Sequence, residues 1–160
     1  MPLPPPNAHR DPLEVHLLGV VDYDAAVFLQ ERLVYETSGR DDRTGGLLLC
    51  EHPPMVTIGR EGSRAYLRAE DRELTARRIE VRWTNRGGGC LVHCPGQLAV
   101  YPVVPLERIG VRPAEYAARL CEAVIDLCTE LRVPAWPSED GRGVAARLGQ
   151  FAYVGAAVKS

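Results

Sequence analysis

The stretch RGGGCLVHCPGQLAVYP, residues 86–102, concentrates residue types that could bind a small molecule. Its first residue, Arg86, carries a planar guanidinium that can hold a carboxylate or phosphate oxygen, or brace loop carbonyls. The three glycines that follow let backbone approach a ligand closely and adopt positive φ angles, which a Cβ would penalise. His93 adds a ring that can donate, accept or carry a proton near neutral pH. The stretch therefore predicts one wall of a pocket.

Other chemistry in this stretch would need its two cysteines. Cys94 follows His93 directly, but a thiol–imidazole pair requires an irregular loop, because adjacent residues on an extended segment point to opposite faces. A metal site made of Cys90, His93 and Cys94 has only three ligands at cramped spacing. We keep both as minor alternatives and expect no metal.

The remaining cysteines and histidines have structural explanations. Cys50, Cys121 and Cys128 lie in apolar contexts, which favours packing in the core. His52, before Pro53 and Pro54, is interpreted as a ring that braces a loop.

The combination of motifs is more specific than any one residue. RGG, a histidine five residues after the second glycine, then PGQ and YP, resembles the lipoate-protein ligase B family, the octanoyl-[acyl-carrier-protein]:protein N-octanoyltransferases. The family pattern is close to RGG-x-x-T-Y-H-G-P-G-Q followed by Y-P. Here Leu91 and Val92 replace Thr-Tyr, and Cys94 replaces the glycine after the histidine.

The resemblance extends over nearly the whole chain. LLLCEHPPMVTIGREG, residues 47–62, is similar to the family's strand pair with its E-H-P-P and T-x-G-R elements. Residues 22–37 resemble its first helix. Residues 149–159, GQFAYVGAAVK, resemble its strand of the form K-I-A-x-x-G.

The resemblance implies transfer of an octanoyl group in lipoate biosynthesis and protein lipoylation. A cysteine thiolate attacks the thioester of octanoyl acyl carrier protein, and a lysine ε-amine of a lipoyl domain then takes the acyl group. The implied acceptors are the lipoyl domains of 2-oxoacid dehydrogenases and the glycine cleavage H protein. The implied chemistry needs neither ATP nor a metal, and no cofactor is expected.

The same resemblance assigns residues to the site. The family lysine, which would stabilise the thiolate, falls on Gln150, whose amide can donate a hydrogen bond but supplies no charge. The chain's one lysine, Lys159, lies nine residues further on, about 30 Å along a strand, and is not expected to replace it. The implied substrate-binding residues are Arg86, Gly87, Gly88, Gly89, Cys90, Leu91, Val92, His93, Tyr153, Val154 and Gly155.

The family's nucleophilic cysteine lies downstream of the strand that carries Gln150, and Ser160 is the last residue printed. We therefore expect a C-terminally truncated member or a fragment, inactive in this 160-residue form. Two alternatives stay open. One is a non-catalytic homologue that binds a carrier protein or a lipoyl domain; the other is an ATP-dependent lipoate or biotin ligase on the same fold.

Composition excludes several other classes. A net charge of −2 argues against general nucleic-acid binding, although residues 60–86 hold eight arginines against five acids, which suits either a solvated helix face or a docking surface for an acidic carrier protein. No signal peptide or membrane-spanning run is recognisable. Five cysteines without paired spacing suit the cytoplasm.

The elements that must position these residues are readable from the sequence. We expect strands at 14–21, 47–51, 55–59, 79–85 and 98–104, the last one buried, and a final strand pair within 143–159. Asp22 is the expected N-cap of a helix to Thr37, and a short charged helix is expected within 69–78. Pro113 is expected to begin a helix within 112–132, with an apolar stripe of Tyr116, Leu120, Val124, Leu127 and Leu131 covering a sheet face.

This order predicts an α+β fold, a mixed or antiparallel sheet packed by helices, like the biotin and lipoate protein ligase catalytic domains with the C-terminal part missing. Residues 1–12 are expected to be a disordered Pro-rich lead, and 13–160 a single, incomplete domain.

Overall fold

The computed structural model describes residues 12–158, and it has helices and three small sheets of three strands each. The α+β prediction is confirmed, although the strands form three separate sheets where the sequence suggested one. The described residues divide into two compact units, 12–53 with 94–110, and 54–93 with 111–158. Residues 1–11 of the predicted lead and Lys159 lie outside the described residues.

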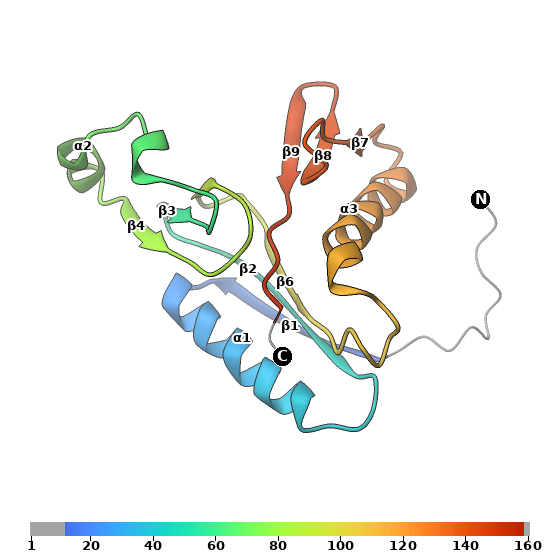
Figure 1. Cartoon of the computed structure of the whole chain (residues 1–160). Helices are drawn as coiled ribbons and strands as arrows, with labels where there is room; N and C mark the ends of the chain where they lie inside the picture. Colours follow the sequence, from blue (N-terminus) through green and yellow to red (C-terminus); the bar gives the residue numbers. More distant parts are fainter. Residues whose placement is uncertain (1–11, 159–160) are drawn as a thin grey trace. The chain divides into compact units, whose positions relative to one another are not determined.

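The first unit is one mixed sheet with one helix. Strand β1 (Leu13–Val20) pairs in parallel with β2 (Gly45–Glu51), which pairs antiparallel with β6 (Ala99–Val103). Helix α1 (Tyr23–Ser38) lies along one face of this sheet, against β2 and β6 (Figure 1). Strand β6 is only half-buried, and Val100 is exposed, so the expectation of a buried strand there was wrong.

Helix α1 begins where the sequence predicted. The Asp22 carboxylate accepts from the backbone N–H groups of Asp24 and Ala25, which satisfies two donors of the first turn. Ala26 and Leu33 are buried, one turn and three turns along the same side. The apolar stripe of the helix therefore faces the sheet.

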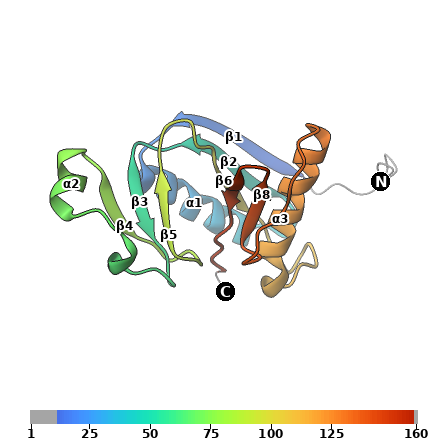
Figure 2. The same ribbon diagram turned by 90° about the horizontal axis from the view of Figure 1, so that it is seen from above.

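The second unit holds the three glycines at 87–89 and the residues that follow them up to His93. Strand β3 (Met55–Ile58) is the middle strand of a sheet, parallel to β4 (Glu80–Trp83) and antiparallel to β5 (Cys90–His93) (Figure 2). A 3-10 turn, η1 (Arg64–Tyr66), and helix α2 (Asp71–Ala76) connect β3 to β4. Strand β5 was missed in the sequence because only four residues separate the glycines from Cys94.

The same unit contains a small antiparallel sheet and the long helix. Strands β7 (Trp136–Pro137), β8 (Gly143–Ala146) and β9 (Gly149–Tyr153) form the sheet, and α3 (Pro113–Glu130) packs against β7 and β8 (Figure 1). Pro113 opens α3 as predicted. The predicted stripe was wrong at its end, since Leu127 and Leu131 are exposed and Cys121 and Cys128 are the buried residues. Within residues 12–158 no helix has the length and apolar character needed to cross a bilayer.

Candidate functional site

A hollow of about 130 Å³ opens in the second unit between the glycine-rich loop with β5 and the segment that follows β9. It brings together two of the segments that the sequence analysis singled out, which lie more than sixty residues apart. Its lining residues are Arg86, Gly88, Gly89, Cys90, Leu91, Asp140, Arg142, Tyr153, Val154 and Gly155.

Arg86 braces the loop on which it stands. Its Nη1 donates to the Gly87 carbonyl at 3.0 Å, and its Nη2 lies 3.0 Å from the Gly89 carbonyl. Nη2 also lies 3.1 Å from the Thr57 carbonyl and 2.8 Å from the Thr57 hydroxyl. The sequence left two roles open for Arg86, binding an anionic oxygen of a ligand or bracing loop carbonyls. These contacts are those of a residue that braces loop carbonyls.

The glycine-rich loop is also fixed by the backbone that continues from β3. The N–H groups of Gly59, Arg60 and Glu61 donate to the carbonyls of Gly89, Arg86 and Gly88, at 3.0, 3.0 and 3.1 Å. Only the middle glycine of the three has a positive φ, of 85°. The close approach that glycine allows here is between two backbones, because a Cβ on Gly59 would lie 2.4 Å from the Gly88 carbonyl oxygen.

The opposite wall is held to the loop by similar contacts. The Gly87 N–H donates to the Ala156 carbonyl at 2.9 Å, and Arg60 Nη2 donates to the same carbonyl at 3.3 Å. A Cβ on Gly155 would lie 2.6 Å from the Gly87 carbonyl oxygen. A glycine at position 155 is therefore needed for the two segments to lie this close.

An ion pair joins the walls at the rim. Glu61 accepts from the Arg142 guanidinium with one oxygen and from the Gly88 N–H, at 3.2 Å, with the other. The Arg142 hydrogen bond, followed by the Gly88 N–H, holds the pKa of the Glu61 carboxyl below its ordinary value. Asp140, on the lining, accepts from the Ser138 hydroxyl at 2.5 Å, and this bond is the main cause of its lowered pKa.

The sequence analysis missed the residues that hold the walls together. Thr57, Gly59 and Arg60 were visible as the T-x-G-R element, but their partners were not. Asp140 and Arg142 gave no signal beyond a polar loop before a strand.

Four of the residues assigned by resemblance do not line the hollow: Gly87, Val92, His93 and Gln150. His93 is buried behind the wall, with its Nε2 3.0 Å from the Thr57 hydroxyl. Val92 is exposed. Gln150, half-buried on β9, donates from its amide to the Ala152 carbonyl at 3.3 Å, and a Cβ on Gly143 would lie 2.3 Å from that amide nitrogen.

The cysteines are placed as the sequence predicted for the core. Cys50, Cys121 and Cys128 are buried, and burial raises the pKa of the Cys50 and Cys121 thiols. Cys90 is partly buried on the lining, with its Sγ 3.4 Å from the Ser63 carbonyl. Across residues 12–158 no three His, Cys, Asp or Glu side chains are grouped as a metal site would require.

The first unit contains a second set of contacts between the predicted motifs. His52 is buried, with Nδ1 2.8 Å from the Val21 carbonyl and Nε2 2.7 Å from the Tyr101 hydroxyl. Because a carbonyl only accepts, Nδ1 carries a proton, and in the neutral ring Nε2 then accepts from the Tyr101 hydroxyl. The prediction that His52 braces a loop is confirmed. The preceding residue, Glu51, accepts from the Gly96 N–H at 2.6 Å and holds the PGQ turn.

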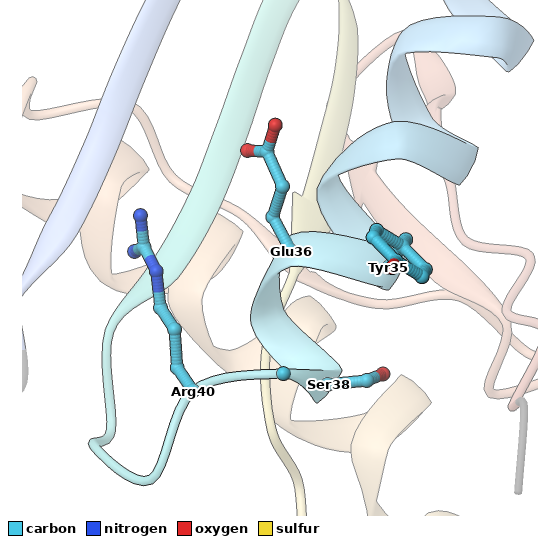
Figure 3. A pocket seen from close by; sticks show the side chains of 5 residues that line it. Tyr35, Glu36, Ser38 and Arg40 are labelled. Carbon is cyan, nitrogen blue, oxygen red and sulfur yellow. The ribbon is translucent and has the colours of Figure 1, made fainter.

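A larger but open hollow of about 520 Å³ lies in the first unit, at the end of α1. It is lined by Tyr35, Glu36, Ser38, Gly39 and Arg40 (Figure 3). Glu36 and Arg40 are engaged by Arg32 and Glu14, and the Ser38 hydroxyl donates to its own helix. None of the motifs singled out in the sequence contributes to it.

Solved structures share the fold. The chain is 18% identical to a bi-partite lipoate protein ligase from Thermoplasma acidophilum, with a TM-score of 0.71 over 94% of this chain and 58% of the other. It is 16% identical to a lipoate-protein ligase A bound with ATP, with a TM-score of 0.63 over 94% of this chain and 62% of that one. The architecture is therefore that of a lipoate protein ligase catalytic domain.

Residues 22–153 match the family model of the lipoyl protein ligase A/B catalytic domain, so the chain belongs to that family. It is 38% identical to an octanoyltransferase of Geotalea uraniireducens over 143 residues, 89% of this chain and 63% of the relative. It is also 38% identical to an octanoyltransferase of Chloroflexus aurantiacus over 145 residues, 91% of this chain and 62% of the relative. The resemblance to the lipoate-protein ligase B branch is thus confirmed, and the chain spans about three fifths of these relatives.

Proposed function

We propose that this chain carries the acyl-binding part of an octanoyltransferase, which moves an octanoyl group from acyl carrier protein to the lysine of a lipoyl domain. The reaction would serve lipoate biosynthesis and protein lipoylation in the cytoplasm. The observation that carries the proposal is the 38% identity to octanoyltransferases along nearly all of the described residues. The proposed acceptors are the lipoyl domains of 2-oxoacid dehydrogenases and the glycine cleavage H protein.

The hollow supports an acyl ligand by its size and lining. Leu91, Tyr153 and Val154 give it apolar side chains, while its backbone walls are glycine-rich. Its volume of about 130 Å³ is close to the ~150 Å³ of an apolar cavity that binds benzene. A hollow of that size takes a group of about six carbons. We infer that it holds the distal part of the octanoyl chain and that the thioester lies toward its open side.

The charged side chains around the hollow already have protein partners. Arg86 is engaged by loop carbonyls and Arg142 by Glu61. Covering a charged group with an apolar chain costs hydration free energy, and this cost is smaller for a charge that keeps hydrogen-bonded protein partners. This arrangement favours an acyl chain over an anionic ligand such as an adenylate, and so favours transfer over the ATP-dependent alternative.

The proposed chemistry assigns different roles to the residues of the site. Arg86 to His93, with Tyr153, Val154 and Gly155, form or support the acyl site, and Gln150 occupies the position of the family lysine. The position of the cysteine nucleophile that the resemblance implies lies downstream of these 160 residues. We therefore expect these residues alone to bind the octanoyl thioester without transferring the acyl group.

The test is an incubation of the 160-residue chain with octanoyl acyl carrier protein and a lipoyl domain, followed by mass spectrometry of both proteins. We expect measurable binding of the octanoyl carrier protein and no octanoyl mass on the lipoyl domain. The same assay on a protein that joins this chain to the C-terminal part of an octanoyltransferase relative should show transfer. If neither protein binds the octanoyl carrier protein, the proposed function is wrong.

The side chain of Gln150 is the observation that supports the non-catalytic alternative. Its amide is hydrogen-bonded to the Ala152 carbonyl and carries no charge, so it cannot stabilise a thiolate as a lysine ammonium does. In the joined protein, Gln150→Lys should therefore raise the transfer rate if the chain serves catalysis. If the joined protein shows no transfer either with Gln150 or with the Gln150→Lys change, and still binds the octanoyl carrier protein, the result would favour a protein that only binds its carrier.

A further inference from the structure

Thr57 lies behind the glycine-rich loop and is completely buried. Its hydroxyl oxygen is 2.8 Å from Arg86 Nη2 and 3.0 Å from His93 Nε2. Arg86 comes from the start of the loop and His93 from the end of β5, so this one hydroxyl touches both ends of the segment that forms the first wall.

The direction of these hydrogen bonds follows from their donors. A guanidinium has only donors, so the Thr57 oxygen must accept from Arg86. The hydroxyl proton then needs an acceptor, and among the described residues His93 Nε2 is the one within hydrogen-bond distance. If Nε2 carried a proton, two donors would point at the same oxygen and the buried hydroxyl proton would have no acceptor, which is costly.

We propose that Thr57 is a positioning residue of the acyl site: through its hydroxyl it ties Arg86 to His93 and keeps His93 as the neutral tautomer with its proton on Nδ1. The role of Thr57 in acyl binding rests on the proposed function, whereas the tautomer does not. His93 then acts as a fixed support for the wall. Its Nε2 is occupied by Thr57 and serves neither as a base nor as an acid toward the ligand.

The register of the sheet explains how this affects the hollow. Thr57 is paired with Leu91, a lining residue, and Met55 is paired with His93. Side chains two residues apart share a face of a strand, so Thr57, Leu91 and His93 lie on one face of the sheet. Losing the hydroxyl would release Arg86 from one acceptor and His93 from its donor, and Leu91 lies between these two residues in the sequence, on β5.

The first experiment is heteronuclear NMR of the histidine rings in the 160-residue chain at neutral pH. The signals of the His93 ring are assigned as those that disappear in His93→Gln. We expect His93 to show the pattern of a proton on Nδ1 and none on Nε2. In Thr57→Ser, which keeps the hydroxyl, the pattern should persist. In Thr57→Val, which keeps the shape, it should change to include protonation at Nε2. A wild-type His93 ring protonated at Nε2 would overturn the proposal, whatever the two Thr57 variants show.

The second experiment measures binding of octanoyl acyl carrier protein by the wild type, Thr57→Ser and Thr57→Val. We expect Thr57→Ser to bind within about twofold of the wild type and Thr57→Val about tenfold more weakly, since Thr57→Val removes the buried hydroxyl that accepts from Arg86 and donates to His93. Equal binding by Thr57→Val and the wild type would remove the positioning role while leaving the proposed function intact. No binding by the wild type would instead contradict the proposed function and leave the tautomer result standing.

Discussion

Single atoms decide how closely the walls of the hollow can approach. Gly59 and Gly155 each face a backbone carbonyl at a distance that no Cβ could tolerate. Gly89, in the loop itself, has no atom within 4 Å of the position a Cβ would take. The need for glycine is therefore greater at positions that face the loop than at one of the loop glycines.

This contrast predicts opposite effects for two identical substitutions. Gly59→Ala should lower the free energy of unfolding by about 3 kcal/mol, because the Gly88 carbonyl and the loop must move. Gly89→Ala should be neutral or stabilising by up to about 1 kcal/mol, since it restricts the unfolded chain. Urea unfolding of both variants checks this, and an equal loss in the two would contradict the close approach.

A second residue-scale prediction concerns the buried ring of His52. Tyr101→Phe removes the O–H that donates to Nε2 and leaves a buried acceptor without that donor. We expect a loss of about 1–3 kcal/mol in unfolding free energy. The control is Tyr35→Phe, which removes the hydroxyl of a side chain that is 82% exposed and should change nothing measurable. Equal midpoints for all three proteins in urea would refute the buried hydrogen bond.

At the scale of elements, the sequence motifs work in pairs. The E-H residues at the end of β2 hold the PGQ turn and Tyr101 of β6, within the first unit. The T-x-G-R residues at the end of β3 hold the RGG loop and His93 of β5, within the second unit. Motifs that are far apart in the sequence are thus hydrogen-bonded partners in the structure.

The ion pair between Glu61 and Arg142 joins the end of β3 to the start of β8, and it should respond to pH. The pKa of Glu61 is lowered in the folded chain, so its contribution to stability is present above its ordinary pKa of 4.5 and is lost as the pH falls through the lowered value. Glu61→Gln should therefore be less stable than the wild type at pH 7 and equally stable near pH 2. Both residues are about half exposed, so the difference should be small and should shrink with added salt.

The measurement is the urea midpoint of both proteins across the acid range. Glu139→Gln is the matched control, because Glu139 is an exposed carboxylate that makes no ion pair among the described residues. A constant gap between Glu61→Gln and the wild type at every pH would contradict the ion pair.

At the scale of the whole molecule, charge is unevenly distributed along the chain. The net charge is −2, yet residues 60–86 carry an excess of three positive charges. Arg64, Arg72 and Arg82 pair with nearby acids, whereas Arg68, Arg77 and Arg78 are exposed and make no ion pair among the described residues. These three arginines are available to an acidic partner.

If that surface docks the acidic carrier protein, affinity should fall as salt rises, because exposed charges are screened over about 10 Å at 0.1 M salt. The double change Arg77→Glu with Arg78→Glu should weaken binding and flatten its salt dependence. Arg119→Glu, on an exposed position of α3, is the control. A salt response that is already flat in the wild type would exclude docking by these arginines.

Local signals in the sequence determined the elements and the family. The N-cap at Asp22, Pro113 at the first turn of α3, and alternating apolar residues act between neighbours, so they can be interpreted without the fold. The glycine-rich loop and the segment at Tyr153 were assigned to facing walls through the family resemblance, and the motifs that carry this resemblance are short and contiguous. The exposed end of the α3 stripe was misjudged because spacing alone does not say how far the covering sheet extends.

Only the tertiary structure decided what these residues touch. Arg86 donates to Thr57 rather than outward, Glu61 meets Arg142 across 81 residues, and Gly155 lies against Gly87. Such contacts join segments whose separation in the sequence carries no information about distance in space. The chemistry of each side chain can be known from its type, whereas its partner exists only once the chain has folded.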